Sequence, residues 1–265
     1  MKNLLLIVAR LVLLQATLLF CTAVASDDDD DLFSCLDVDQ TVSTKQRTVS
    51  LANLIDASAA TALCRQSMQY CLNGDYATAI QPLENCLKIP GLLKHQEARL
   101  LVCLGVSYCQ EFQCAKAIGT LEKALTYAEL TDAGRNTALY YLASSHFYLR
   151  NHALANELFK VTIANPNIPS EVKQRAYAYQ GISYHQMKNH AVAVDSFRAA
   201  LAMQGSIEVD SLNYNLGISL FGMKNYDDAI DPLFNASQSS TLNARYKCNA
   251  KICLAECYLK GSLCC

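Results

Sequence analysis

The chain has 265 residues, of which 22 are lysine or arginine and 24 are aspartate or glutamate, so its formal net charge is −2. No stripe of basic residues runs along it, and this argues against nucleic acid as a partner. The chain also has 13 cysteines, and their pairing state depends on whether the protein works in an oxidising or a reducing compartment.

Residues 1–25 have the composition of a secretory signal peptide. A nearly apolar run that carries only Lys2 and Arg10 ends in Thr22-Ala23-Val24-Ala25, with small residues at the spacing that signal peptidase accepts. We expect cleavage before Ser26 and export to a periplasm, a cell envelope or the medium. The alternative is an uncleaved helix that anchors the chain in a membrane, although Arg10 would then lie inside the bilayer.

Residues 26–57 are expected to form an acidic N-terminal segment followed by a capping helix. Asp27–Asp31 place five like charges side by side, so this stretch should not pack and should act as a solubilising tip. Leu51, Leu54 and Ile55 have helical spacing and indicate a short helix that covers the first repeat.

Over residues 58–262 one pattern returns at a nearly constant step. Full copies begin at residues 67, 105, 143, 181 and 217 and a partial sixth begins at 255, so the steps are 38, 38, 38, 36 and 38. A fixed period in this range is typical of a solenoid. Residues 263–265 form a cysteine-containing C-terminal end outside the repeats.

Each repeat contains two apolar stripes at helical spacing, separated by a short polar turn. Small residues recur in the first helix of each repeat, at Ser67, Gly105, Ala143, Gly181, Gly217 and Ala255. Large residues recur in the second helix, at Leu83, Leu121, Phe159, Phe197 and Leu233. Small-against-large packing predicts antiparallel helical hairpins. Because no strand-like alternation occurs, the predicted fold class is all-α.

The pattern resembles the tetratricopeptide repeat (TPR). The residues that carry the resemblance are Leu104-Gly105 with Tyr108, the turn Asn73–Tyr76 and the small/large alternation of the second helices. The resemblance implies a right-handed superhelical solenoid of antiparallel helix pairs. The chain departs from the family in its repeat length, which is 38 residues in most steps, whereas the usual TPR has 34. A Sel1-type repeat of similar length fits less well.

In TPR proteins the first helices line a concave surface that binds proteins, and the register of the repeat transfers this role to particular side chains. The predicted groove residues are Met68, Arg99, Val102, Val106, Tyr140, Phe147, Tyr148, Arg175, Ile182, His185, Tyr214, Ile218 and Phe221. The centre of this groove is aromatic and its flanks carry arginines, which favours a protein ligand in the form of an extended peptide or an amphipathic helix. The alternative is that these residues pack against a further superhelical turn or a neighbouring chain.

The cysteines fall into two clusters. After loss of Cys21 with the signal peptide, seven lie between Cys35 and Cys114 and five between Cys248 and Cys265. In an exported protein this pattern favours disulfides. The candidates for a disulfide or an interchain cross-link are Cys35, Cys253, Cys257, Cys264 and Cys265. Two interpretations stay open beside this one: cysteines such as Cys86 are small buried hydrophobic residues, or the C-terminal cluster holds zinc.

No catalytic constellation is found in the sequence. His146, His152 and His190 occupy positions that the repeat explains, and no nucleophile elbow, zinc-protease motif or phosphate-binding loop occurs. We therefore expect no enzymatic activity, no cofactor and no metal. The expected function is an exported scaffold that binds a peptide or helix of a protein partner. The alternative is a structural envelope protein whose cysteines join chains into a disulfide-linked oligomer.

Overall fold

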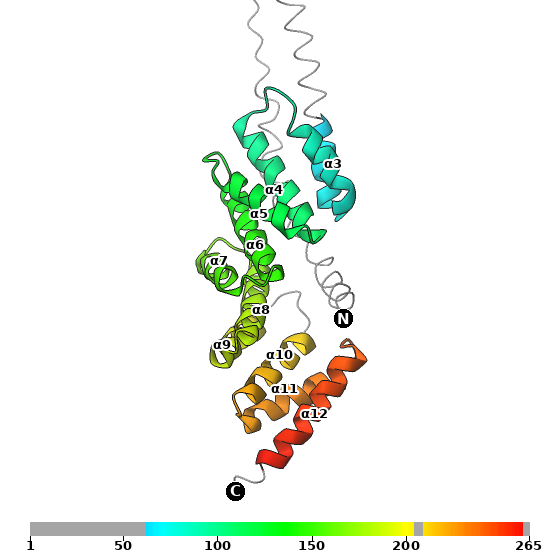
Figure 1. Ribbon diagram of the computed structural model, residues 1–265, viewed down its shortest axis with the longest axis vertical. Helices are drawn as coiled ribbons and strands as arrows, with labels where there is room; N and C mark the ends of the chain where they lie inside the picture. The colour runs from blue at the N-terminus through cyan, green and yellow to red at the C-terminus, as the bar shows by residue number, and fades with distance from the viewer. Residues whose placement is uncertain (1–61, 204–208, 262–265) are drawn as a thin grey trace, which may run out of the picture. The chain divides into compact units, whose positions relative to one another are not determined.

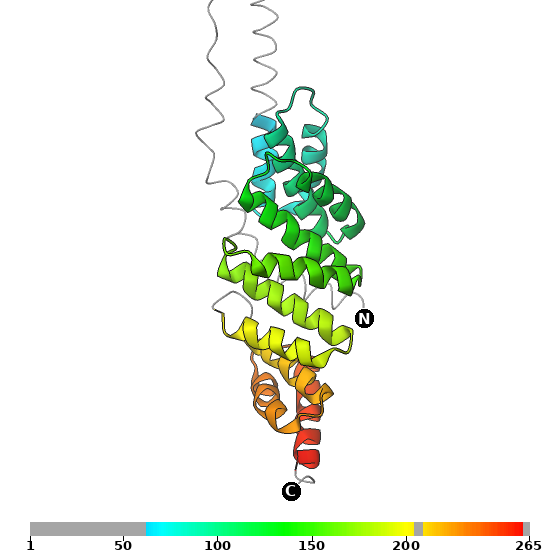
Figure 2. The ribbon, with the colours of Figure 1, turned by 90° about the vertical axis from the view of Figure 1, so that its left-hand side faces the viewer.

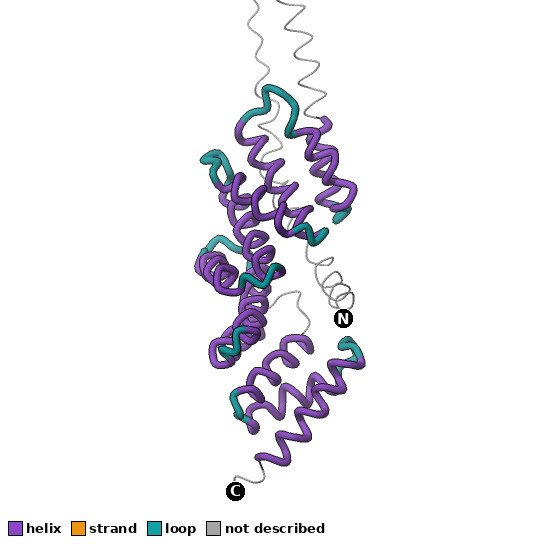
Figure 3. The backbone as a smooth tube through the Cα atoms, viewed as in Figure 1, coloured by secondary structure: helices purple, strands orange, loops and turns teal. Residues whose placement is uncertain are grey.

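The computed structural model describes residues 62–203 and 209–261, and all regular structure in these two ranges is helical (Figures 1 and 3). The prediction of an all-α fold is therefore confirmed. None of the described helices is both long enough and apolar enough to cross a membrane. The signal peptide, acidic segment and capping helix predicted for residues 1–57, and the cysteines at 264 and 265, lie outside the described residues.

The chain forms two compact units, the first ending at Tyr141 and the second beginning at Leu142. The first unit contains helical residues 62–72, followed by α3 (Tyr76–Cys86), α4 (Lys94–Gln110), α5 (Cys114–Leu125) and the first part of α6 (Asp132–Tyr148). In this unit α3 packs against α4, and α4 packs against α5.

The second unit contains the rest of α6 and six further helices. These are α7 (His152–Ala164), α8 (Ser170–Gln186), α9 (His190–Leu201), α10 (Val209–Gly222), α11 (Tyr226–Gln238) and α12 (Ala244–Gly261). Successive helices from α7 to α12 pack against one another, and α10 also contacts α8 and α12 (Figure 2). The first helices of successive repeats, α8, α10 and α12, are thus neighbours within this unit.

The predicted small-against-large packing is confirmed in both units. A Cβ atom added to Gly105 would lie 2.5 Å from Leu121, one added to Gly181 would lie 2.7 Å from Phe197, and one added to Gly217 would lie 2.7 Å from Leu233. The five large residues of the second helices are all fully buried. Glycine in the first helix therefore lets the large side chain of the second helix pack directly against the backbone.

Every hairpin turn uses one residue in the left-handed region of the backbone. The residues occupy equivalent positions of the repeat, with φ of +79° at Gly74, +57° at Phe112, +65° at Arg150, +61° at Lys188 and +62° at Lys224. The N–H of the next residue donates to a carbonyl five residues earlier in all five turns, as from Asn189 to Tyr184 at 2.9 Å. This is the Schellman geometry, in which a left-handed residue ends the helix and satisfies its last carbonyls.

Candidate interaction surface

In the first unit most of the predicted groove residues are buried. Val102 and Val106 lie on α4, where every residue from position 100 to 110 is buried. Tyr140 is 3% exposed, and its ring packs edge-on against Tyr141 with a centroid distance of 5.1 Å. Met68 and Arg99 keep intermediate exposure. The first unit therefore presents only two of the predicted groove residues at its surface.

In the second unit one predicted residue, Arg175, is buried. Its Nη2 atom lies 3.3 Å from the Oε1 atom of Glu171, one turn earlier on α8. This cation is engaged within its own helix. The other seven predicted groove residues of this unit have intermediate exposure. They are Phe147, Tyr148, Ile182, His185, Tyr214, Ile218 and Phe221.

A first group of partly exposed rings lies between the end of α6 and α8. The Phe147 ring is 5.5 Å from that of Tyr148 and 5.2 Å from that of Tyr179, both edge-on. The hydroxyl oxygens of Tyr148 and Tyr179 share a hydrogen bond of 3.2 Å. Edge-to-face packing of this kind fixes the orientation of each ring.

A second group lies on α10 and α12. The Tyr214 and Tyr246 rings are 5.0 Å apart, and the Nδ2 atom of Asn249 donates to the Tyr214 hydroxyl at 2.7 Å. Burial raises the pKa of Tyr214, and the hydrogen bond from Asn249 opposes this shift.

The partly exposed rings of α6, α8, α10 and α12 that are described here are called the aromatic set. Its members are Phe147, Tyr148, Tyr179, Tyr214, Phe221 and Tyr246.

The end of α10 adds an aromatic pair with a cation above it. Phe221 packs edge-on against Tyr226 at 5.7 Å, and the Nζ atom of Lys260 lies 5.6 Å and 5.4 Å from their two ring centroids. Cation–π attraction therefore links α12 to the turn between α10 and α11.

Two histidines meet where α8, α9 and α10 converge. The His185 and His190 rings are 4.9 Å apart, and the Nδ1 atom of His185 lies 2.9 Å from the Ser219 hydroxyl of α10. A Cβ atom added to Gly222 would lie 3.0 Å from the His190 ring. Burial, followed by the charge of His190, lowers the pKa of His185. The site thus favours neutral imidazole.

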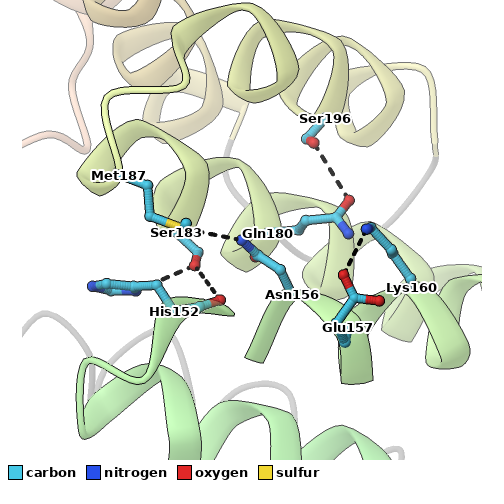
Figure 4. Close-up of polar contacts among 8 residues, drawn as sticks. All are labelled: His152, Asn156, Glu157, Lys160, Gln180, Ser183, Met187 and Ser196. Atoms are coloured by element: carbon cyan, nitrogen blue, oxygen red, sulfur yellow. Dashed lines mark hydrogen bonds and ion pairs between the residues drawn. The ribbon is translucent and has the colours of Figure 1, made fainter. Parts of the chain in front are cut away.

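Partly buried side-chain hydrogen bonds join α8 to α7 and to α9 (Figure 4). The Ser183 hydroxyl lies 3.2 Å from Nδ1 of His152 and donates to the His152 carbonyl at 3.3 Å. The Nδ2 atom of Asn156 donates to the Met187 sulfur at 3.6 Å, and the Ser196 hydroxyl donates to Oε1 of Gln180 at 3.4 Å. These contacts set the register of the helix that carries Tyr179, Ile182 and His185.

Sequence reasoning missed Tyr179 and Tyr246 as members of the surface. The repeat relates Tyr179 to Tyr141, which lies 38 residues earlier in the chain. The Gln110 side chain donates to the Tyr141 hydroxyl at 3.4 Å, and the Tyr148–Tyr179 hydrogen bond joins the equivalent two positions of the next repeat. No comparable repeat of a contact points to Tyr246.

None of the nine cysteines in the described part of the chain forms a disulfide. Among them Cys248 is exposed, whereas the cross-link candidates Cys253 and Cys257 are buried. Burial raises the pKa of both candidate thiols. Cys35, Cys264 and Cys265 lie outside the described residues. Over the residues that the structure describes, no three His, Cys, Asp or Glu side chains are grouped so as to hold a metal ion.

Antiparallel helix pairs, a glycine-against-large core and a left-handed residue in each hairpin define a TPR-type helical-repeat fold. Several solved structures share this fold, and two of them serve as examples. One is MamA (AMB-1), with a TM-score of 0.56 and 16% identity over 71% of this chain and 96% of that chain. The other is PilF of Pseudomonas aeruginosa, with a TM-score of 0.55 and 18% identity over 77% of this chain and 90% of that chain. No protein-family model and no curated protein matches the chain.

Proposed function

We propose that this chain is an exported protein-interaction scaffold that binds a peptide or an amphipathic helix of a partner protein on the first helices of its second unit. The observation that carries the proposal is the aromatic set, in which each ring packs against at least one neighbouring ring and remains partly exposed. Helical-repeat folds of this type use the surface of stacked first helices for binding. Export is supported by the composition of residues 1–25.

The rings of the aromatic set are pre-organised for binding. A ring that is already held by an edge-on neighbour or a hydroxyl hydrogen bond loses little freedom when a partner covers it. Tyr148 and Tyr214 are held in this way, by Tyr179 and by Asn249 respectively. Aromatic residues are also the side chains that most often dominate protein interfaces. An apolar partner segment would therefore gain contact area on this surface at a small entropic penalty.

The test is a comparison of partner capture by two variants of the full chain in its native cells. The first variant combines Tyr148→Ala, Tyr214→Ala and Phe221→Ala. The matched control is Phe234→Ala, which removes an exposed ring from α11, a second helix. Each chain is cross-linked in the cells, purified and compared by quantitative mass spectrometry, after thermal unfolding has shown that it is folded.

We expect the triple variant to lose its specific partner by about tenfold or more, as for interface anchors, and the control to retain it. If the folded triple variant recovers every protein that the parent recovers, the aromatic set is not the binding surface. If the control loses the partner and the triple variant keeps it, the second helices bind instead.

A further inference from the structure

The first described helix carries two buried thiols, and each lies beside a thiol of a neighbouring helix. Cys64 and Cys71 both belong to helical residues 62–72 and are seven residues apart, which is two turns, so they share one face of the helix. This face is directed towards α3 and α4, as the contacts of each thiol show.

The first pair is Cys64 with Cys86, the last residue of α3. The hydroxyl of Ser67 lies 3.5 Å from the Cys86 sulfur, and Cys64 is one turn before Ser67 on the same helix. Cys64 therefore lies on the helix face that meets Cys86. Burial, followed by the neighbouring Cys86 thiol, raises the pKa of Cys64 to about 12.

The second pair is Cys71 with Cys103 on α4. The Cys71 thiol donates to the backbone carbonyl of Cys103 at 3.7 Å, so the two cysteines are direct neighbours on adjacent helices. The neighbouring Cys71 thiol, helped by the charge of Arg99, lowers the pKa of Cys103.

We infer that Cys64–Cys86 and Cys71–Cys103 are disulfide-forming pairs, which close on contact with a low-molecular-weight disulfide oxidant and fasten helical residues 62–72 to α3 and α4. All four thiols belong to the first unit, so their pairing is independent of partner binding by the aromatic set. None of them is among the cross-link candidates that the sequence predicts, and all four are buried.

The chemistry is two successive thiol–disulfide exchanges at each pair, with oxidised glutathione as the oxidant. One protein thiolate attacks the glutathione disulfide, forms a mixed disulfide and releases one glutathione thiolate. The second protein thiol then loses its proton, attacks the protein sulfur of the mixed disulfide and releases the other glutathione. In total two protein thiols give up two electrons and two protons, and one glutathione disulfide becomes two glutathione thiols. Because the sulfurs are buried, the exchange takes place during folding or when residues 62–72 open locally.

Trypsin provides a direct readout, because it cuts after lysine and arginine. Cys64 lies in peptide 48–65, Cys71 and Cys86 share peptide 66–88, and Cys103 lies in peptide 100–116 with Cys109 and Cys114. The two disulfides would join these three peptides into one covalent assembly. The purified full chain is refolded with a mixture of reduced and oxidised glutathione, alkylated with iodoacetamide and mapped without reduction.

We expect peptides 48–65, 66–88 and 100–116 to disappear from the non-reduced map as separate species and to return on reduction. Cys86→Ser should release peptide 48–65 and leave the other two joined. Cys103→Ser should release peptide 100–116 and leave the other two joined. The matched control is Cys114→Ser, on α5, because Cys114 is also buried but its raised pKa owes nothing to a second thiol.

Recovery of all three peptides unjoined and fully alkylated from the oxidised parent would overturn the inference. A joined assembly that persists in both Cys86→Ser and Cys103→Ser would overturn the pairing. If a serine variant does not fold, fragmentation of the joined peptides from the parent assigns the same sulfurs and decides the question.

Discussion

Individual glycines and turn residues determine how closely the two helices of each repeat approach. Gly105 and Gly181 are positions where a single methyl group would enter the volume of Leu121 or Phe197. The turn residues face a different constraint, because the backbone at four of the five hairpins is left-handed at a residue with a side chain. Both constraints can be measured by substitution at one position.

Gly105→Ala is expected to destabilise the chain by about 1–3 kcal/mol, because the new Cβ overlaps Leu121 in a closely packed core. The matched control is Gly119→Ala on the exposed side of α5, where a Cβ atom would have no neighbour within 4 Å. That control substitution should stabilise the chain by about 0.5–1 kcal/mol, since alanine has a higher helix propensity than glycine. Urea denaturation followed by circular dichroism compares the two. Equal effects of the same sign would contradict the packing argument.

Lys188→Gly is expected to stabilise the chain by about 0.5–1 kcal/mol. Lysine at φ +61° carries a steric strain that glycine lacks, and this gain exceeds the greater freedom of glycine in the unfolded chain. Lys188→Ala removes the same charge but retains the Cβ atom, so it should give no such gain. Thermal unfolding of both variants beside the parent measures the difference, and a stabilisation by alanine equal to that by glycine would refute the role of φ.

At the scale of elements, partly buried hydrogen bonds hold neighbouring helices in register. Ser183 and His152 join α8 to α7, and His185 joins α8 to Ser219 of α10. Burial lowers the pKa of both histidines. The charge of Arg150 adds to this shift at His152, and the charge of His190 adds to it at His185. Protonation therefore opposes the packing of these helices.

The free energy of unfolding should fall on acidification. His185 and His152 have folded-state pKa values below the usual 6.5, so the unfolded chain binds protons more readily. The contribution of the two neutral histidines to the free energy of unfolding is complete above pH 6.5. It is lost as the pH falls from 6.5 to the lower pKa of the folded state. His185→Gln should reduce the loss between about pH 7.5 and pH 5.5, since glutamine does not titrate. His95→Gln, at an exposed position on α4, is the control, and an equal reduction there would refute the assignment.

At the scale of the whole chain, export is the expectation with the sharpest readout. If residues 1–25 are a cleaved signal peptide, the protein from its native cells begins at Ser26. Intact-mass spectrometry of protein purified from those cells measures this directly. A mass equal to that of the full 265 residues would show that the segment is retained, and the proposal of an exported, cleaved scaffold would fail.

The repeat made the helices and their small/large contacts predictable, because burial is periodic wherever the same hairpin recurs. The exposure of single groove residues was not predictable in this way. Tyr140 and Tyr148 both fall on the predicted groove, yet one is buried and the other partly exposed. The paired thiols were not predictable either, since their contacts join positions 22 and 32 residues apart that no spacing rule connects.

The left-handed turn residues have an electrostatic consequence. Arg150, Lys188 and Lys224 each lie two residues beyond the end of a first helix, where the aligned peptide dipoles leave a partial negative charge. A cation at this position offsets part of the strain of its own backbone. Because dissolved ions screen that attraction, raising the ionic strength should remove the compensation and leave the strain. The advantage of glycine over lysine at position 188 should therefore grow with salt concentration.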